Sequence, residues 1–128
     1  MARKKSTGLT AAEHRLMEVV WSNGKATVAE VVEALAKPDG PAYNTVLTTM
    51  TILERKGYLR HVAPRSGRAF VYYPKVSRAK ASKSAVRHLL RQFFGDSPEA
   101  LVLNLLEDET LSDTELKRVR KLLQEKPE

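Results

Sequence analysis

The sequence of 128 residues predicts a mainly α-helical protein, with three helices and a two-stranded hairpin followed by a small group of C-terminal helices. Three observations support this prediction. Apolar residues recur at helical spacing before residue 57 and after residue 77, and at a strand-like period of two between them. Ser or Thr precedes Glu by three positions at three predicted helix starts. Basic and acidic residues also divide unevenly between the two parts.

The first two helices are each predicted by a capping box, Thr10-Ala-Ala-Glu13 and Thr27-Val-Ala-Glu30. We expect the first helix to end near Asn23-Gly24, and residues 25–27 to pair briefly as an edge strand. The sequence Pro38-Asp-Gly-Pro41 then breaks the chain. The residues predicted to form the buried sides of these helices are Leu16, Met17, Val20, Trp21, Val28, Val31, Val32 and Leu35.

The third predicted helix, over residues 43–56, has an apolar side and a polar side, and Gly57 follows where a left-handed helix cap is wanted. Short hydrogen-bonding side chains in a row suit a helix that enters the DNA major groove, although a Thr-rich helix that merely faces water remains open. The apolar side consists of Val46, Leu47, Met50 and Leu53, and the polar stripe consists of Asn44, Thr48, Thr51 and Arg55.

After Gly57 the sequence pattern changes to that of strands. Residues 58–62 and 69–73 are rich in aromatic and β-branched types, and Pro64-Arg-Ser-Gly67 between them is typical of a hairpin tip. Three helices followed by such a hairpin form a winged helix-turn-helix, in which the third helix enters the major groove and the wing contacts the flanking backbone. The basic residues along this predicted wing are Arg60, Arg65 and Arg68.

Basic residues are concentrated in the first three quarters of the chain. The net charge is +7, from 22 Lys and Arg against 15 Asp and Glu. Residues 1–94 hold 17 basic and 6 acidic side chains, whereas residues 95–128 hold 5 and 9. Between Arg55 and Arg91, eleven Lys and Arg occur without any Asp or Glu. Because solvated surfaces normally mix both signs, this run favours a nucleic-acid partner over a solubilising role.

Three amphipathic helices are expected from residue 77 onward, with Gly95 as the stop of the first, Ser97-Pro98 opening the second and a capping box over residues 112–115 opening the third. They are too few and short to enclose a private core, and each buried Leu or Phe contributes roughly 1.5–3 kcal/mol. We therefore expect a twofold dimer, with folding back onto the winged domain as the alternative. The predicted dimerisation residues are Val86, Leu89, Leu90, Phe93, Phe94, Leu101, Val102, Leu105, Leu106, Leu116, Val119 and Leu123.

The predicted organisation is a flexible basic tail over residues 1–8, a winged-helix domain over 9–76 and a helical dimerisation domain over 77–128. The tail fits either a passive end or an arm that lies along a DNA groove. Absence of cysteine excludes disulfides, thiolate zinc sites and iron–sulfur clusters. No apolar run reaches membrane-spanning length and no hydrophobic signal core follows the basic start, so we expect a cytoplasmic protein without membrane insertion.

An enzyme is not expected. His14, His61 and His88 belong to three separate predicted elements. The sequence contains no HExxH motif, P-loop, Gly-rich dinucleotide turn or nucleophile elbow. We therefore assign no catalytic residue, metal site or cofactor.

Five short motifs occur along the chain in a specific order. They are Glu13-x-x-x-Met17-x-x-x-Trp21, Ala42-Tyr43-x-Thr45-Val46, Lys56-Gly57, Tyr72-Tyr73-Pro74 and Leu101-Val-Leu-Asn104. With this set the chain resembles, over about residues 9–125, the penicillinase repressor family, the bacterial repressors of β-lactamase and methicillin-resistance genes. The resemblance implies a winged-helix N-terminal domain, a helical dimerisation domain and repression of nearby promoters through inverted repeats.

The resemblance also implies site residues. Asn44, Thr45 and Thr48 match the family's recognition-helix positions, and the tip over residues 65–68 matches its wing. Leu47 and Ile52 stand where the staphylococcal members carry basic residues, so guanine reading by Arg or Lys is lost there and the operator is expected to differ. The complete set of predicted DNA contacts is Tyr43, Asn44, Thr45, Thr48, Thr51, Arg55, Lys56, Arg60, Arg65 and Arg68.

The staphylococcal members are switched by a membrane-bound zinc metalloprotease sensor that cuts after an Asn in the C-terminal domain. Asn104-Leu105 matches that bond, with Leu where those members have Phe, and a polar position on a dimer helix explains Asn104 equally well. Some relatives respond to copper through C-terminal cysteines, a mode excluded for a chain without cysteine.

The sequence therefore predicts a homodimeric transcriptional repressor that binds an inverted-repeat, double-stranded DNA operator and is relieved by proteolysis if the sensor is present. The alternative is a winged-helix protein-interaction module of a larger assembly, without sequence-specific DNA binding. Such a module would tolerate acidic residues on the third helix and wing, where Glu54 stands alone.

Overall fold

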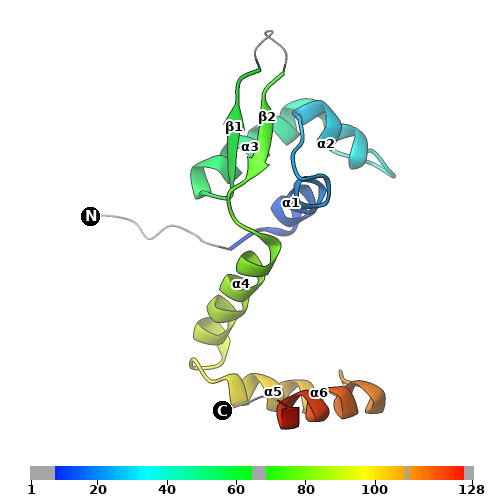
Figure 1. The fold of residues 1–128 in the computed structure, drawn as a ribbon, viewed down its shortest axis with the longest axis vertical. Coiled ribbons are helices and arrows are strands. Elements are labelled where there is room, and N and C mark those ends of the chain that lie inside the picture. Colours follow the sequence, from blue (N-terminus) through cyan, green and yellow to red (C-terminus); the bar gives the residue numbers. More distant parts are fainter. Residues whose placement is uncertain (1–7, 65–68, 109, 126–128) are drawn as a thin grey trace, which may run out of the picture. The chain divides into compact units, whose positions relative to one another are not determined.

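The computed structural model of the protein describes residues 8–64, 69–108 and 110–125. Figure 1 shows the order of the elements in these segments. The helices are α1 (Ala11–Asn23), α2 (Val28–Ala34), α3 (Tyr43–Lys56), α4 (Arg78–Phe93), α5 (Pro98–Glu107) and α6 (Asp113–Glu125). The strands are β1 (Leu59–Val62) and β2 (Val71–Pro74). This arrangement confirms the predicted mainly α class, with a winged helix-turn-helix followed by further helices.

The chain divides into two compact units, Met1–Val86 and Arg87–Glu128. The predicted domain boundary after residue 76 precedes α4, whereas the division between the compact units falls inside this helix. The functional boundaries stay a prediction.

The predicted capping boxes fix where α1 and α2 begin. The Thr10 hydroxyl accepts from the Glu13 backbone N–H at 3.1 Å, and the Glu13 carboxylate accepts from the Thr10 N–H at 2.9 Å. Thr27 and Glu30 form the same reciprocal pair at the start of α2, with the same two distances. Each pair satisfies two N–H groups that the first helical turn leaves without partners.

The third helix buries one face and ends where the sequence predicts. Val46, Met50 and Leu53 are almost completely buried, and Gly57 closes the helix in the left-handed conformation with φ 93°. Leu47, which the sequence pattern places on the same apolar side, is not buried with them, because its side chain is 38% exposed. Each residue advances the direction of the side chain by about 100° around the helix axis. Leu47 therefore lies at the edge of the apolar stripe, on the side of α3 that faces the hairpin.

The hairpin is antiparallel, with Leu59 opposite Pro74 and Val62 opposite Val71. Each strand is one or two residues shorter at its start than predicted. The expected edge pairing of residues 25–27 is confirmed as a single bridge. The Ala26 N–H donates to the Tyr72 carbonyl at 3.0 Å, and the Tyr72 N–H donates to the Ala26 carbonyl at 2.8 Å. This bridge attaches the segment between α1 and α2 to the hairpin.

One hydrophobic core joins α1, α2, α3 and the hairpin. Burying each of its large side chains contributes roughly 1.5–3 kcal/mol, so this core sets the orientation of the three helices. Trp21, Val32 and Leu35 pack against it while remaining partly exposed. The largest fully buried side chains are Leu16, Met17, Val20, Val31, Val46, Met50, Leu53 and Leu59.

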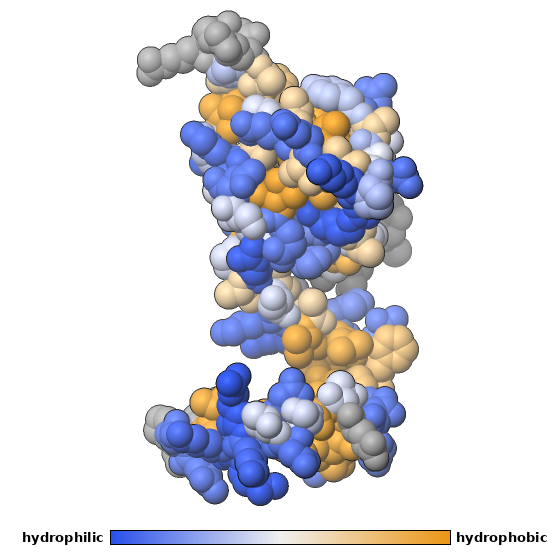
Figure 2. All heavy atoms as spheres, turned by 90° about the vertical axis from the view of Figure 1, so that its right-hand side faces the viewer, coloured by the Kyte–Doolittle hydropathy of each residue, from blue (hydrophilic) through white to orange (hydrophobic). Residues whose placement is uncertain are grey.

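The C-terminal unit, by contrast, encloses no core within the described residues. Ser97 caps α5 and a Ser112–Glu115 capping box opens α6, as predicted. None of the described residues after Leu90 is buried. Leu90, a predicted dimerisation residue, is itself buried within the chain and so offers little surface to a partner. Figure 2 shows orange, apolar side chains at the surface of this unit. Its exposed large apolar residues are Phe93 on α4, Val102, Leu103 and Leu106 on α5, and Val119, Leu122 and Leu123 on α6.

Across the described ranges, none of the helices combines the length and the apolar character that a membrane crossing requires.

Candidate nucleic-acid interface

The polar stripe of α3 is exposed along the length of the helix. Asn44, Thr45, Thr48, Thr51 and Arg55 all face solvent, while the opposite side is buried in the core. Nonpolar packing behind an exposed row of short polar side chains is the arrangement that a reading helix requires.

Two of the threonine hydroxyls on α3 are already occupied. Thr51 Oγ1 donates to the Leu47 carbonyl at 2.9 Å, and Thr49 Oγ1 donates to the Thr45 carbonyl at the same distance. Thr51 therefore keeps only acceptor capacity for an outside partner. Within the described residues the Thr48 hydroxyl is held by no hydrogen bond, so it can both donate and accept.

The beginning of α3 has the features of an anion site. Ala42 occupies the N-cap and forms no side-chain hydrogen bond there, and the first turn carries no acidic residue. The first N–H groups of the helix and the positive end of its dipole therefore remain available to a phosphate. Tyr43, the first residue of α3, is 49% exposed at the same end.

Two of the predicted backbone-contacting arginines lie in the described part of the winged unit. Arg55 is exposed near the C-terminal end of α3. Arg60 is exposed on β1, and its guanidinium lies over the Tyr73 ring at 4.7 Å. The stacking holds the β1 arginine against the hairpin while leaving its N–H groups available. Arg65 and Arg68, at the predicted wing tip, lie outside the described residues.

Lys56 has a structural role that the sequence analysis missed. Its ammonium lies 2.8 Å from Glu13 Oε1 and 3.2 Å from the Gly8 carbonyl oxygen. The Lys56 and Glu13 side chains are only 18% and 9% exposed. We therefore replace the predicted role of Lys56 in neutralising DNA phosphates with one in joining the end of α3 to the beginning of α1.

The pKa of Glu13 reflects two opposing effects. Burial raises the pKa of this carboxyl, but hydrogen bonds from Lys56 and Thr10, together with the Lys56 charge, outweigh burial. The pKa of Glu13 is therefore below its ordinary value. The same carboxylate caps α1 and receives the ammonium from α3, so its ionised form stabilises two elements at once.

A side-chain contact between Glu54 and His61 joins α3 to the wing. Glu54 Oε2 lies 2.8 Å from His61 Nδ1 on β1. The His61 ring in turn packs against Phe70 and Tyr72, at centroid distances of 4.7 and 5.6 Å. Glu54, the only acidic residue on α3, thus faces the hairpin through a histidine. The sequence showed that both strand segments are rich in aromatic and β-branched residues, but it did not indicate the carboxylate partner of His61.

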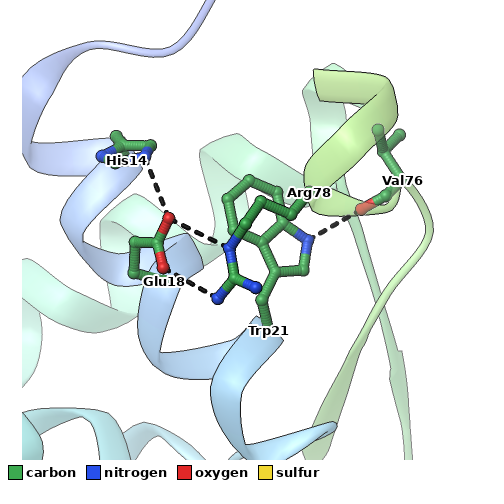
Figure 3. Close-up of polar contacts among 5 residues, drawn as sticks. All are labelled: His14, Glu18, Trp21, Val76 and Arg78. Atoms are coloured by element: carbon green, nitrogen blue, oxygen red, sulfur yellow. Dashed lines mark hydrogen bonds and ion pairs between the residues drawn. The ribbon is translucent and has the colours of Figure 1, made fainter. Parts of the chain in front are cut away.

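The start of α4 is attached to α1 by three side chains (Figure 3). Trp21 Nε1 donates to the Val76 carbonyl at 2.8 Å, and Arg78 donates to the Glu18 carboxylate at 2.8 and 3.3 Å. His14 lies on the other side of the same carboxylate at 3.2 Å. The hydrogen bond from Arg78 lowers the pKa of Glu18. These contacts fix the direction in which the chain leaves the hairpin.

Comparison with known proteins identifies the family. A family model described as Penicillinase repressor matches residues 9–125. The chain belongs to the penicillinase repressor family. The family comprises transcriptional repressors rather than enzymes, in agreement with the resemblance noted from the sequence motifs.

Individual relatives of the penicillinase repressor family match over nearly the whole chain. The penicillinase repressor of Bacillus licheniformis is 30% identical over 122 residues, which cover 95% of this chain and 94% of that protein. The methicillin resistance regulatory protein MecI of Staphylococcus aureus (strain N315) is 24% identical, covering 95% and 98%. The solved DNA-binding domain of the repressor BlaI shares 31% identity and a TM-score of 0.50, over 61% of this chain and 93% of that domain.

In this member of the penicillinase repressor family, replacing Lys56 by Met should lower the free energy of unfolding of the N-terminal unit by about 3 kcal/mol, because a buried carboxylate loses its cation. Urea unfolding followed by the fluorescence of the single tryptophan, Trp21, would measure it. Lys83→Met, at an exposed position of α4, is the matched control. Equal stability of the two variants would contradict the structural role of Lys56.

The Glu13 carboxyl should also make stability depend on pH. Since its pKa is lowered in the folded chain, its contribution is complete above the pKa of the unfolded chain and is lost as pH falls through the folded value. Unfolding at a series of pH values from about 6 to 3 should show a steeper loss for the natural chain than for Glu13→Gln, which keeps the capping oxygen but cannot ionise. Parallel curves would contradict this assignment.

Proposed function

We propose that this protein is a homodimeric transcriptional repressor that binds an inverted-repeat DNA operator through α3 and the wing. The observation that carries the proposal is the exposed polar face of α3, with Asn44 and Thr48 at its centre and a fully buried stripe behind it. Its relatives support it, since they include a penicillinase repressor and a DNA-binding domain of a repressor.

The proposed contacts divide into reading and positioning. Asn44 and Thr48 meet base edges, because their side chains are short, exposed and able both to donate and to accept. Thr45 and Thr51 lie along the same groove, where Thr51 acts as an acceptor. The groups that meet phosphates and fix the register are Tyr43, the N-terminus of α3, Arg55, Arg60, Arg65 and Arg68.

The dimer accounts for the surface of the C-terminal unit. Leu122 and Leu123 are 58% and 68% exposed, and Phe93 is 67% exposed. A second copy would cover such side chains and would hold two α3 helices on one duplex. Inverted repeats in the operator would then match the twofold symmetry of the protein.

Relief by proteolysis at Asn104-Leu105, the mode implied by the staphylococcal members, requires more than an accessible bond. Asn104 is exposed, but the peptide bond lies within α5. A membrane metalloprotease sensor would have to open this helix, since helical N–H and C=O groups are paired within it. Within a single chain, α5 has no buried residue to oppose such opening, so its resistance in the dimer would come from the contacts with the partner copy.

Reading and positioning residues should respond differently to substitution. With duplexes selected from a random pool by the full chain, Thr48→Val should change the preference among sequences by about tenfold, because one base-edge contact is lost. Arg60→Ala should weaken binding to all duplexes similarly and reduce the salt dependence. Gel shifts would compare both with Thr114→Val on α6.

Four phosphate-contacting arginines per protomer give a dimer a log–log salt slope of roughly −7. A slope near zero, or an unchanged preference in the Thr48→Val variant, would contradict the proposed reading face. If non-specific competitor DNA abolishes binding completely, the binding is not sequence-specific. That result would favour the alternative, a protein-interaction module.

A charge on the apolar surface of α6 should dissociate the dimer. Leu123→Glu should yield monomers in sedimentation experiments and weaken operator binding, because the second reading helix is lost. The neighbouring Gln124→Glu adds the same charge at an exposed polar position and should remain dimeric. If the Leu123 variant sediments like the natural chain, α6 does not form the interface.

A further inference from the structure

An apolar hollow lies beside the polar stripe of α3. Its lining includes Tyr43 and Leu47 from α3 and Phe70 just before β2, with Val28, Ala69 and Tyr72 around them. Tyr43, Leu47 and Phe70 are 49%, 38% and 47% exposed. These three side chains form an exposed apolar cluster between α3 and the wing, and the contacts proposed above involve only Tyr43 of the three.

Leu47 in this cluster lies on the side of α3 that is proposed to meet DNA. It directly precedes Thr48 and stands one helical turn after Asn44, so a duplex that contacts both polar residues also covers Leu47. The Leu47 carbonyl also accepts a hydrogen bond from the Thr51 hydroxyl, so the Thr51 hydrogen is used within the helix. Leu47 therefore presents a branched aliphatic side chain among hydrogen-bonding neighbours.

The surroundings of the hollow favour a polyanionic partner. None of the residues lining it is acidic. The nearest acid on α3, Glu54, is paired with His61, whose ring packs against Phe70 on the wing side. Arg55 is exposed on α3, which lines the hollow, and Arg60 is exposed on β1, the strand that pairs with β2. In the major groove, the apolar group among the edges of the four bases is the C5-methyl of thymine.

We propose that Leu47, flanked by Tyr43 and Phe70, is a specificity-determining residue that recognises the C5-methyl group of a thymine in each half-site. This inference rests on the proposed function, because it requires α3 in the major groove. Asn44 and Thr48 select bases through hydrogen bonds, whereas Leu47 selects an A·T pair through an apolar contact. A basic side chain at this position would instead favour guanine. At this base pair, the operator of the present chain is therefore expected to hold an A·T pair where one read by Lys or Arg would hold a G·C pair.

The test removes the methyl group and nothing else. Duplexes selected by the full-length chain are remade with deoxyuridine in place of thymine, one symmetric pair of positions at a time. One pair should weaken binding by about fourfold per half-site, the effect expected for one buried carbon group. If cytosine replaces that thymine, 5-methylcytosine should recover part of the loss, since it carries the same methyl.

Leu47→Ala provides the matched variant. It should bind the thymine and deoxyuridine duplexes equally well, because the side chain that detects the methyl is gone, and Trp21 fluorescence should show an intact N-terminal unit. Leu47→Lys should shift preference at the same base pair toward guanine. A penalty for deoxyuridine that persists in Leu47→Ala would overturn the proposal, as would the lack of any sensitive thymine.

These failures differ from a failure of the proposed function. If the inference alone is wrong, the natural chain still binds selected duplexes and Thr48→Val still alters their ranking, while the methyl has no effect. If the chain selects no duplex at all, both proposals fail together.

Discussion

The burial of Val46, Met50 and Leu53 is the constraint on which the rest of the winged unit depends. Once these three side chains are in the core, α3 cannot rotate about its axis without exposing them, and each contributes roughly 1.5–3 kcal/mol. Asn44 and Thr48 are then held outward with no contact of their own to fix them. The Lys56–Glu13 and Glu54–His61 pairs add ties from the last turn of α3 to α1 and to β1. The orientation of the proposed reading face is thus set by residues that are not among the proposed DNA contacts.

Three acidic residues of the winged unit have partners inside the chain, which leaves exposed arginines available on its surface. Glu13 is paired with Lys56, Glu18 with Arg78 and His14, and Glu54 with His61. Each of these three carboxylates thus has a partner within the chain. The two cations in these pairs are Lys56 at the end of α3 and Arg78 at the start of α4. Arg55 and Arg60 take part in none of them and remain available to an outside anion. The absence of Asp and Glu between residues 55 and 91 explains why these arginines have no acidic neighbours in the sequence on their C-terminal side.

Local signals in the sequence predicted the elements well, and tertiary contacts limited the rest. The capping boxes, Gly57 and the change of period each depend on residues within a few positions, so helix starts, one helix end and the hairpin followed directly. The role of Lys56 depends on Glu13, which is 43 positions away in the sequence. Arg78 likewise binds Glu18, which is 60 positions away. A basic residue at the end of a recognition helix resembles a phosphate contact until its partner is known. The exposure of Leu47 did not follow from the pattern, because a residue at the edge of an apolar stripe is buried or exposed according to how the hairpin packs beside it.

The contrast between the two units bears on the proposed relief of repression by proteolysis. The winged unit has a continuous core, whereas the described residues of α5 and α6 include no buried side chain. In the proposed dimer, these helices would gain their stability from the partner copy. Opening α5 would then remove the interface together with the helix, because neither has a private core to retain it. The winged unit would survive, but each copy would bind alone and lose the gain in effective concentration that links two half-sites. Release from DNA thus requires no change in the reading face.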